Sequence, residues 1–131
     1  MTSSTLMRAL GAALFGLALV GPARAEPKDY EFQLVQRELK MGEAVVAVRL
    51  VDKRSGKAVP DAVIFAKRID MAPDGMPTMD SPIEQVSSTE PGVYQFKTRL
   101  MMAGGWQLSL GAKVQGEEGT VENKLVLKAT Q

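Results

Sequence analysis

The chain has 131 residues, with 16 Lys and Arg against 15 Asp and Glu, and it contains neither histidine nor cysteine. This length suits one domain. The missing residue types exclude Ser-His-Asp and Cys-His catalysis, disulfides, iron–sulfur clusters, and zinc sites built from histidine or cysteine. The near-balanced charge argues against nucleic-acid binding, which calls for a basic patch. No acid–base pair or nucleophile stands out, so we expect no enzymatic activity.

The N-terminus has the pattern of a secretory signal peptide. A polar start ends in Arg8, an uncharged apolar run follows from Ala9 to Gly21, and Ala23-Arg24-Ala25 is an A-x-A cleavage site. The apolar run is shorter than the roughly 20 residues that a membrane-spanning helix needs. We therefore predict that residues 1–25 are a cleaved signal peptide. The mature chain, residues 26–131, is then one exported domain without a membrane span.

Short strands separated by turns are expected along the whole mature chain. The runs with strand character cover residues 30–37, 44–51, 62–69, 83–87, 93–102, a run that starts at Trp106, and residues 121–129. The run 44–51 is nearly continuous in apolar residues, which is typical of a strand buried on both faces. Residues 70–82 lose the pattern and are predicted to form a long loop. About seven short strands of this kind predict an all-β, immunoglobulin-like antiparallel β-sandwich.

Methionine placement is the one unusual local feature. Met71, Met76 and Met79 fall within the predicted loop, where core packing is not the obvious reason for a large apolar side chain. A thioether is a soft, uncharged ligand that selects Cu(I) over harder divalent ions. A bent loop can bring these three sulfurs together. Met101 and Met102, at the end of the strongest predicted strand, are candidates to complete the site.

A packing role for the methionines remains open, because methionine also fills irregular gaps in a core. Met41, alone before Gly42, is interpreted as packing or chance. Met102 shares its predicted strand face with Phe96 and Leu100, which indicates a core position, whereas Met101 points to the other side and is the better ligand of the two. For the three loop methionines, metal binding and packing both remain possible interpretations.

Three aspartates surround the loop methionines: Asp70, Asp74 and Asp80. Carboxylates are calcium ligands, but this spacing does not follow an EF-hand loop. We expect them instead to cap turns through Asx-type hydrogen bonds. Trp106, which follows Gly104-Gly105, is predicted to be a core residue.

Four segments together resemble the YtkA-like, or FixH-like, family of periplasmic domains. They are Gly56-Lys57-Ala58-Val59-Pro60-Asp61-Ala62, the loop from Met71 to Met79, Pro91-Gly92-Val93-Tyr94, and Met102-Ala103-Gly104-Gly105-Trp106-Gln107-Leu108. The resemblance covers about residues 45–128. It implies a small β-sandwich that accompanies heavy-metal efflux systems or copper-handling machinery. Many relatives carry histidine in this loop and this chain has none, so the resemblance points to Cu(I) or Ag(I) rather than Cu(II) or Zn²⁺.

The resemblance also implies ligands and partners. The loop methionines Met71, Met76 and Met79 and the methionine before the G-x-W turn, Met102, match the family pattern, and Met101 is added from the strand argument. The expected function is a periplasmic accessory protein that binds Cu(I) or Ag(I) through thioethers and passes the ion to an envelope heavy-metal efflux system. The alternative is a metal-free, immunoglobulin-like interaction module that docks on an envelope transporter or adaptor complex.

Overall fold

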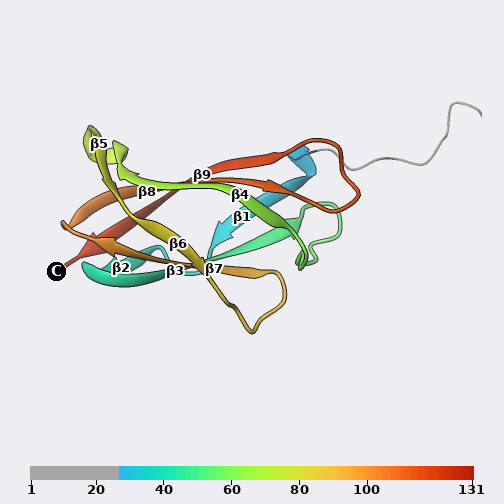
Figure 1. Cartoon of the computed structure of the whole chain (residues 1–131), viewed down its shortest axis with the longest axis horizontal. Coiled ribbons are helices and arrows are strands. Elements are labelled where there is room, and N and C mark those ends of the chain that lie inside the picture. The colour runs from blue at the N-terminus through green and yellow to red at the C-terminus, as the bar shows by residue number, and fades with distance from the viewer. Residues whose placement is uncertain (1–26) are drawn as a thin grey trace, which may run out of the picture.

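The computed structural model describes residues 27–131, and the predicted signal peptide, residues 1–25, lies outside them (Figure 1). The described residues form nine strands and two short 3-10 turns, η1 (Pro27–Asp29) and η2 (Ala72–Asp74). The strands are β1 (Tyr30–Leu34), β2 (Glu38–Lys40), β3 (Gly42–Asp52), β4 (Val63–Met71), β5 (Met76–Ser81), β6 (Ile83–Val86), β7 (Val93–Leu100), β8 (Gly104–Lys113) and β9 (Val121–Thr130). None of the described helices has the length and apolar character needed to span a bilayer.

Two sheets face each other across one core. One sheet has the strand order β1-β3-β7-β6, and the other has the order β2-β9-β8-β4-β5. Neighbouring strands run antiparallel, except that the three-residue edge strand β2 runs parallel to β9. The predicted all-β, immunoglobulin-like sandwich is therefore confirmed, with one short parallel pair at an edge.

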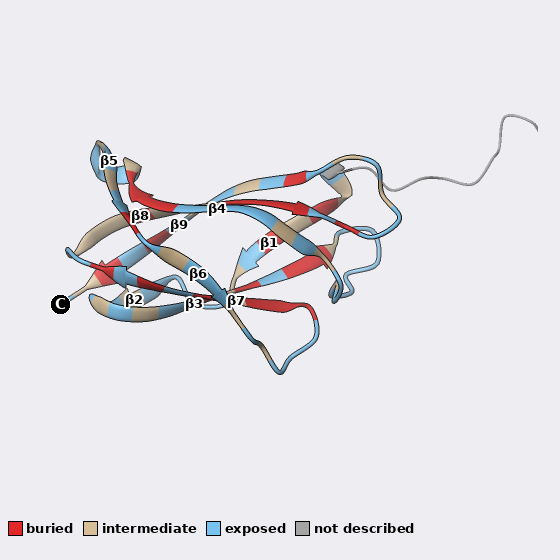
Figure 2. Ribbon diagram, in the orientation of Figure 1, coloured by how far each residue is buried: buried red, intermediate tan, exposed pale blue. Residues whose placement is uncertain are grey.

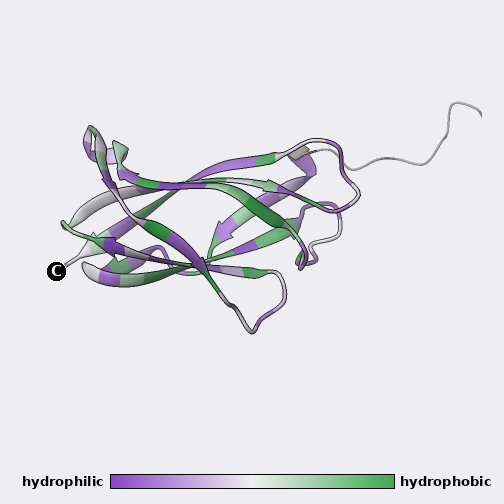
Figure 3. Cartoon of the chain, viewed as in Figure 1, coloured by the Kyte–Doolittle hydropathy of each residue, from purple (hydrophilic) through white to green (hydrophobic). Residues whose placement is uncertain are grey.

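Alternation along the strands separates core from surface. In β7 the side chains of Tyr94, Phe96 and Leu100 are buried, while Lys97 and Arg99 between them are exposed. Figure 2 shows buried and exposed residues alternating along the strands, and Figure 3 shows a similar alternation of hydrophobic and hydrophilic residues. Period-two alternation places one set of side chains on each face of a strand, so the sequence pattern directly creates this core.

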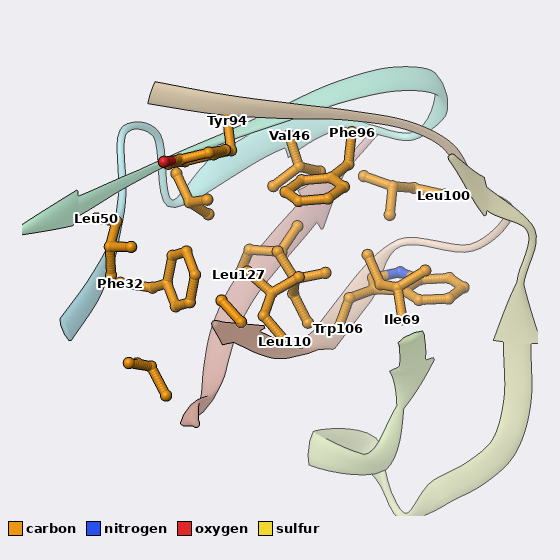
Figure 4. Close-up of a cluster of buried hydrophobic side chains, with 14 of the residues drawn as sticks. Phe32, Val46, Leu50, Ile69, Tyr94, Phe96, Leu100, Trp106, Leu110 and Leu127 are labelled. Carbon is orange, nitrogen blue, oxygen red and sulfur yellow. The ribbon is translucent and has the colours of Figure 1, made fainter. Parts of the chain in front are cut away.

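Large apolar side chains fill the space between the sheets (Figure 4). Trp106 is fully buried, as predicted, and lies beside Leu100 and Ile69. Phe32 and Leu50 lie toward the other end of the same cluster. Fully burying one large apolar side chain contributes about 1.5–3 kcal/mol. This core is what holds the sandwich together, because the chain has no cysteine to form a disulfide.

Two strand predictions need correction. The run 44–51 is not buried on both faces: Val46, Val48 and Leu50 are buried, but Val45 before them and Arg49 among them are exposed. The outer face of β3 meets solvent because no second layer covers this sheet. Residues 70–82 are not a long loop either. They contain the end of β4, the η2 turn and all of β5, so this region is a β-hairpin.

Three connections lie at the same end of the sandwich: β2 to β3, β4 to β5, and β7 to β8. Figure 1 shows all three near the C-terminus of the chain. The described methionines lie in or next to these connections, so we call this end of the molecule the methionine end. Its methionines are Met41, Met71, Met76, Met79, Met101 and Met102.

Candidate functional site at the methionine end

The β4–β5 hairpin carries the three methionines that were predicted to lie in a loop. Met71 ends β4 and pairs in register with Met76, the first residue of β5. The turn between them closes through Gly75, whose φ of 77° is in the left-handed region that glycine adopts without strain. Met71 is fully buried, and Met76 and Met79 are partly buried against the same core. The three thioethers therefore contact the core, and the sulfur of Met71 is closed to solvent in this structure. The assignment of these methionines as ligands stays a prediction.

The aspartates of this hairpin hold its shape. Asp70 Oδ1 accepts a hydrogen bond from the Ala72 backbone N–H at 2.9 Å, which confirms the predicted Asx-type cap for Asp70. The prediction is wrong for Asp74 and Asp80, whose carboxylates bind Gly105 and Arg68 instead. Asp70 Oδ2 and Asp80 Oδ2 both contact the Arg68 guanidinium, at 2.9 and 3.0 Å. One arginine thus binds two of the three carboxylates. Among residues 27–131 no group of three or more His, Cys, Asp or Glu side chains is placed to hold a metal ion.

Met101 and Met102 lie on the connection between β7 and β8. The strand predicted to reach Met102 ends at Leu100, and residues 101–103 cross from one sheet to the other. The prediction of a core position for Met102 is therefore wrong, since Met101 is 42% and Met102 40% exposed. The Trp106 indole Nε1–H donates a hydrogen bond to the Met102 carbonyl at 3.0 Å. This bond fixes the backbone of the connection while both thioether side chains remain accessible.

The two methionine-bearing connections are in direct contact. Asp74 Oδ2, in η2, accepts a hydrogen bond from the Gly105 backbone N–H at the start of β8, at 3.1 Å. Gly104, with a φ of 135°, allows this approach: a Cβ there would collide with the Asp74 carboxylate and lie 3.1 Å from Met71 Cε. The Met71 methyl group therefore packs against the backbone two residues after Met102. The segment with the buried Met71 therefore contacts the segment that follows the exposed Met101 and Met102.

Met41 was interpreted from the sequence as packing or chance, but its side chain is 41% exposed. It lies between β2 and β3, and its backbone N–H donates a hydrogen bond to the Thr130 carbonyl at 2.7 Å. A packing role does not describe this residue. A single methionine between two short strands gives no periodic signal, so only the strand register identifies its neighbours.

Two tyrosines with raised pKa values lie away from the methionine end. Burial, together with a 2.7 Å hydrogen bond to Glu117, raises the pKa of Tyr30 to about 12. Burial also raises the pKa of Tyr94, whose hydroxyl donates a hydrogen bond to the Val59 carbonyl at 2.7 Å and accepts one from the Ala62 N–H at 3.0 Å. Both hydroxyls make hydrogen bonds that hold strands to neighbouring connections, so we assign them structural roles.

The sequence model of the YtkA-like family matches residues 24–111. The chain belongs to the YtkA-like family. The match spans the Met71–Met79 hairpin and the Met101–Met102 connection, and it confirms the YtkA-like resemblance inferred from the sequence. No curated protein matches this YtkA-like chain.

Two solved structures are similar to this YtkA-like domain. One is the crystal structure of the Lin-41 filamin domain, with 14% identity and a TM-score of 0.47 over 82% of this chain and 98% of that one. The other is the ZirS C-terminal domain, with 11% identity and a TM-score of 0.48 over 84% of this chain and 81% of that one.

Proposed function

We propose that this YtkA-like domain is a non-enzymatic periplasmic accessory protein that binds Cu(I) or Ag(I) through methionine thioethers and passes the ion to an envelope heavy-metal efflux system. The observation that carries the proposal is the contact between the two methionine-bearing connections. Asp74 joins η2 to Gly105, and this brings the Met71–Met79 hairpin next to Met101 and Met102. Thioethers are soft ligands that suit soft monovalent ions.

The methionines differ in exposure, and we assign them different roles in metal binding accordingly. Met101 and Met102 are accessible enough to take an ion from solvent or from a donor protein. Met76 and Met79, on the hairpin, are partly covered. Met71 is fully buried and packs against Gly104, so its sulfur reaches an ion only if the hairpin moves. Ligand exchange between accessible and partly covered sulfurs gives a route for uptake and release.

Thioether ligation also suits an exported protein that meets changing pH. A thioether has no proton to lose before it binds a metal, whereas histidine and cysteine ligands must be deprotonated. Ion capture through methionine should therefore persist in mildly acidic conditions. The transfer partner is a metal-efflux or copper-handling protein of the envelope, which is the kind of partner that the family resemblance implies.

Substitution of methionine by leucine tests the proposal, because it removes the sulfur but keeps size and apolarity. We would compare the Met101→Leu/Met102→Leu double variant with Met71→Leu in a competition assay for Cu(I) under anaerobic conditions. The double variant should lose affinity by about tenfold or more, and Met71→Leu should lose less because its sulfur is enclosed. Both should remain folded, since swaps that conserve volume cost less than about 1.5 kcal/mol. Unchanged affinity in a variant with all five predicted ligands replaced would contradict the proposal.

Export is tested separately from metal binding. The protein expressed with its own leader should be recovered from the periplasm, and its intact mass should correspond to a chain that begins at Glu26. Recovery in the cytoplasm with the leader attached would contradict the periplasmic part of the proposal.

A metal-free interaction module is the second candidate, and the exposure of Met101 and Met102 favours it as well. Flexible, accessible methionines make adaptable apolar contacts with partner proteins. This function predicts that Met→Leu changes leave partner binding intact, whereas Met76→Glu abolishes it. A pull-down of the candidate efflux partner with and without copper distinguishes the two functions, because only the metal-dependent function requires the ion.

A further inference from the structure

Two segments cross between the sheets side by side at the methionine end. Residues 40–42 lead from β2 in one sheet to β3 in the other, and residues 100–104 lead from β7 to β8. In the first sheet the crossings meet at the pair Gly42 and Leu100. In the second sheet they lie on either side of β9, where Lys40 pairs with Thr130 and Gly104 pairs with Ala129. The two crossings are therefore adjacent in the first sheet and one strand apart in the second.

Met41 and Met101 lie next to the last pair of the β3–β7 ladder. The β3–β7 ladder ends at the pair Gly42 and Leu100. Met41 directly precedes Gly42, and Met101 directly follows Leu100. One pair further into the ladder, Glu43 and Arg99 face outward and lie 3.9 Å apart as an ion pair. Paired residues on antiparallel strands have Cα atoms about 4.5–5.5 Å apart, so the two segments are close together where Met41 and Met101 leave the ladder. Met41 and Met101 are therefore one residue beyond the Gly42–Leu100 pair, each on one of the two neighbouring crossings.

Hydrogen bonds to backbone atoms fix both crossings while the methionine side chains stay accessible. Met41 N–H is bound to the Thr130 carbonyl, and the Met102 carbonyl is bound by the Trp106 indole. Met41, Met101 and Met102 are 41%, 42% and 40% exposed. A fixed backbone with free thioethers is a preorganised arrangement for ligands that must be reached from outside.

We infer that Met41 is an additional ligand that joins Met101 and Met102 in an exposed thioether site for a soft monovalent ion. This inference deepens the proposed function and rests on it, since it assigns the entry point of the same Cu(I) or Ag(I) pathway. It moves the accessible site from the hairpin to the two crossings, and Met76 and Met79 remain partly covered on the hairpin. The ion would be taken up by the three exposed sulfurs before it meets the partly covered ones.

Methyl NMR with Ag(I) as the probe tests this assignment residue by residue. The full-length protein, exported with its own leader, is labelled with ¹³C at the methionine methyl groups and titrated with silver nitrate in chloride-free buffer. Single Met→Leu variants assign the resonances. At substoichiometric Ag(I) the Met41 and Met101 resonances should shift together with that of Met102, ahead of the resonance of the enclosed Met71.

Affinity measurements on Met41→Leu complete the test. This variant should bind Ag(I) about tenfold or more weakly than the unsubstituted protein, with an unchanged melting temperature because the side chain is exposed. Val45→Leu is the matched control, since it alters another exposed apolar side chain near the start of β3 without involving sulfur. Its affinity should equal that of the unsubstituted protein.

The outcomes separate this inference from the proposed function. If Ag(I) shifts other methionine resonances while that of Met41 does not move and Met41→Leu binds normally, Met41 is not a ligand and the proposed function stands. If no methionine resonance moves and no binding is measured, both the inference and the proposed function are wrong.

Discussion

The Asp74 carboxylate accepts a 3.1 Å hydrogen bond from the backbone N–H of Gly105, and this contact links the turn of the β4–β5 hairpin to the start of β8. The two residues are 31 positions apart in sequence and belong to different connections of the sandwich. Without this bond, the hairpin that carries Met71, Met76 and Met79 would depend on strand pairing and core packing alone for its position.

Removal of this contact should weaken metal binding more than folding. Asp74→Ala leaves the strands intact but loses a hydrogen bond worth about 0.5–1.5 kcal/mol. We expect Cu(I) affinity to fall by a few-fold to about tenfold, measured by competition with a chelator. Asp80→Ala is the control, because it removes an exposed carboxylate from the same hairpin that contacts Arg68 and not β8. Equal losses in the two variants would show that the contact with Gly105 has no special role.

Gly104 should be intolerant of a side chain. Its φ of 135° is rarely adopted by other residues, and a Cβ would collide with Asp74 and crowd Met71. Gly104→Ala should lower the free energy of unfolding by about 2 kcal/mol or more, measured by urea denaturation. Gly116→Ala is the control, because Gly116 also has a positive φ, of 85°, but has open space around it. It should cost only about 1 kcal/mol of backbone strain, and a cost equal to that of Gly104→Ala would contradict the steric argument.

Tyr94 should stabilise the segment between β3 and β4 through its hydroxyl. The group donates a hydrogen bond to the Val59 carbonyl and accepts one from the Ala62 N–H. Tyr94→Phe keeps the ring in the core but leaves these two backbone groups without their partner. We expect a loss of about 1–3 kcal/mol in the free energy of unfolding, with greater hydrogen exchange at the Ala62 amide. A silent substitution would mean that water replaces the hydroxyl at no cost.

Alkaline pH should destabilise the fold partly through Tyr30. Its pKa is raised from 10.0 to about 12 in the folded chain, by burial first and then by Glu117. Between these two values the unfolded chain releases the phenolic proton while the folded chain retains it, so the free energy of unfolding falls as pH rises. Urea denaturation near pH 9 and near pH 11 should show a smaller fall for Tyr30→Phe than for the unsubstituted protein. The same pH dependence in both proteins would contradict the raised pKa.

Alternation was sufficient to predict the main strands. Tyr94, Phe96 and Leu100 occupy the buried face of β7 as the sequence indicated, and Trp106 lies in the core. These positions follow from period-two patterning, because one face of each strand must be buried for two sheets to pack. The match to the YtkA-like family over residues 24–111 includes β7 and Trp106.

The features that the sequence did not predict lie at edges and crossings. β5 has the sequence Met-Pro-Thr-Met-Asp-Ser, which lacks strand character. It nevertheless pairs with β4 at the edge of its sheet, where proline is tolerated because one side of the strand has no partner. Met102 was extrapolated from the β7 pattern, but the chain leaves the sheet after Leu100. The sequence did not indicate a role for Met41, because pairing between distant strands determines which residues lie near it.

Anaerobic titration of the exported protein with Cu(I), against a competing chromogenic chelator, tests the central claim most directly. The account predicts one-to-one binding near pH 7 that persists with little loss near pH 5, because thioether ligands carry no proton to compete with the ion. If the chelator retains all of the Cu(I) at both pH values, the methionine end is not a metal site. The exposed methionines would then be assigned to contacts with a partner protein.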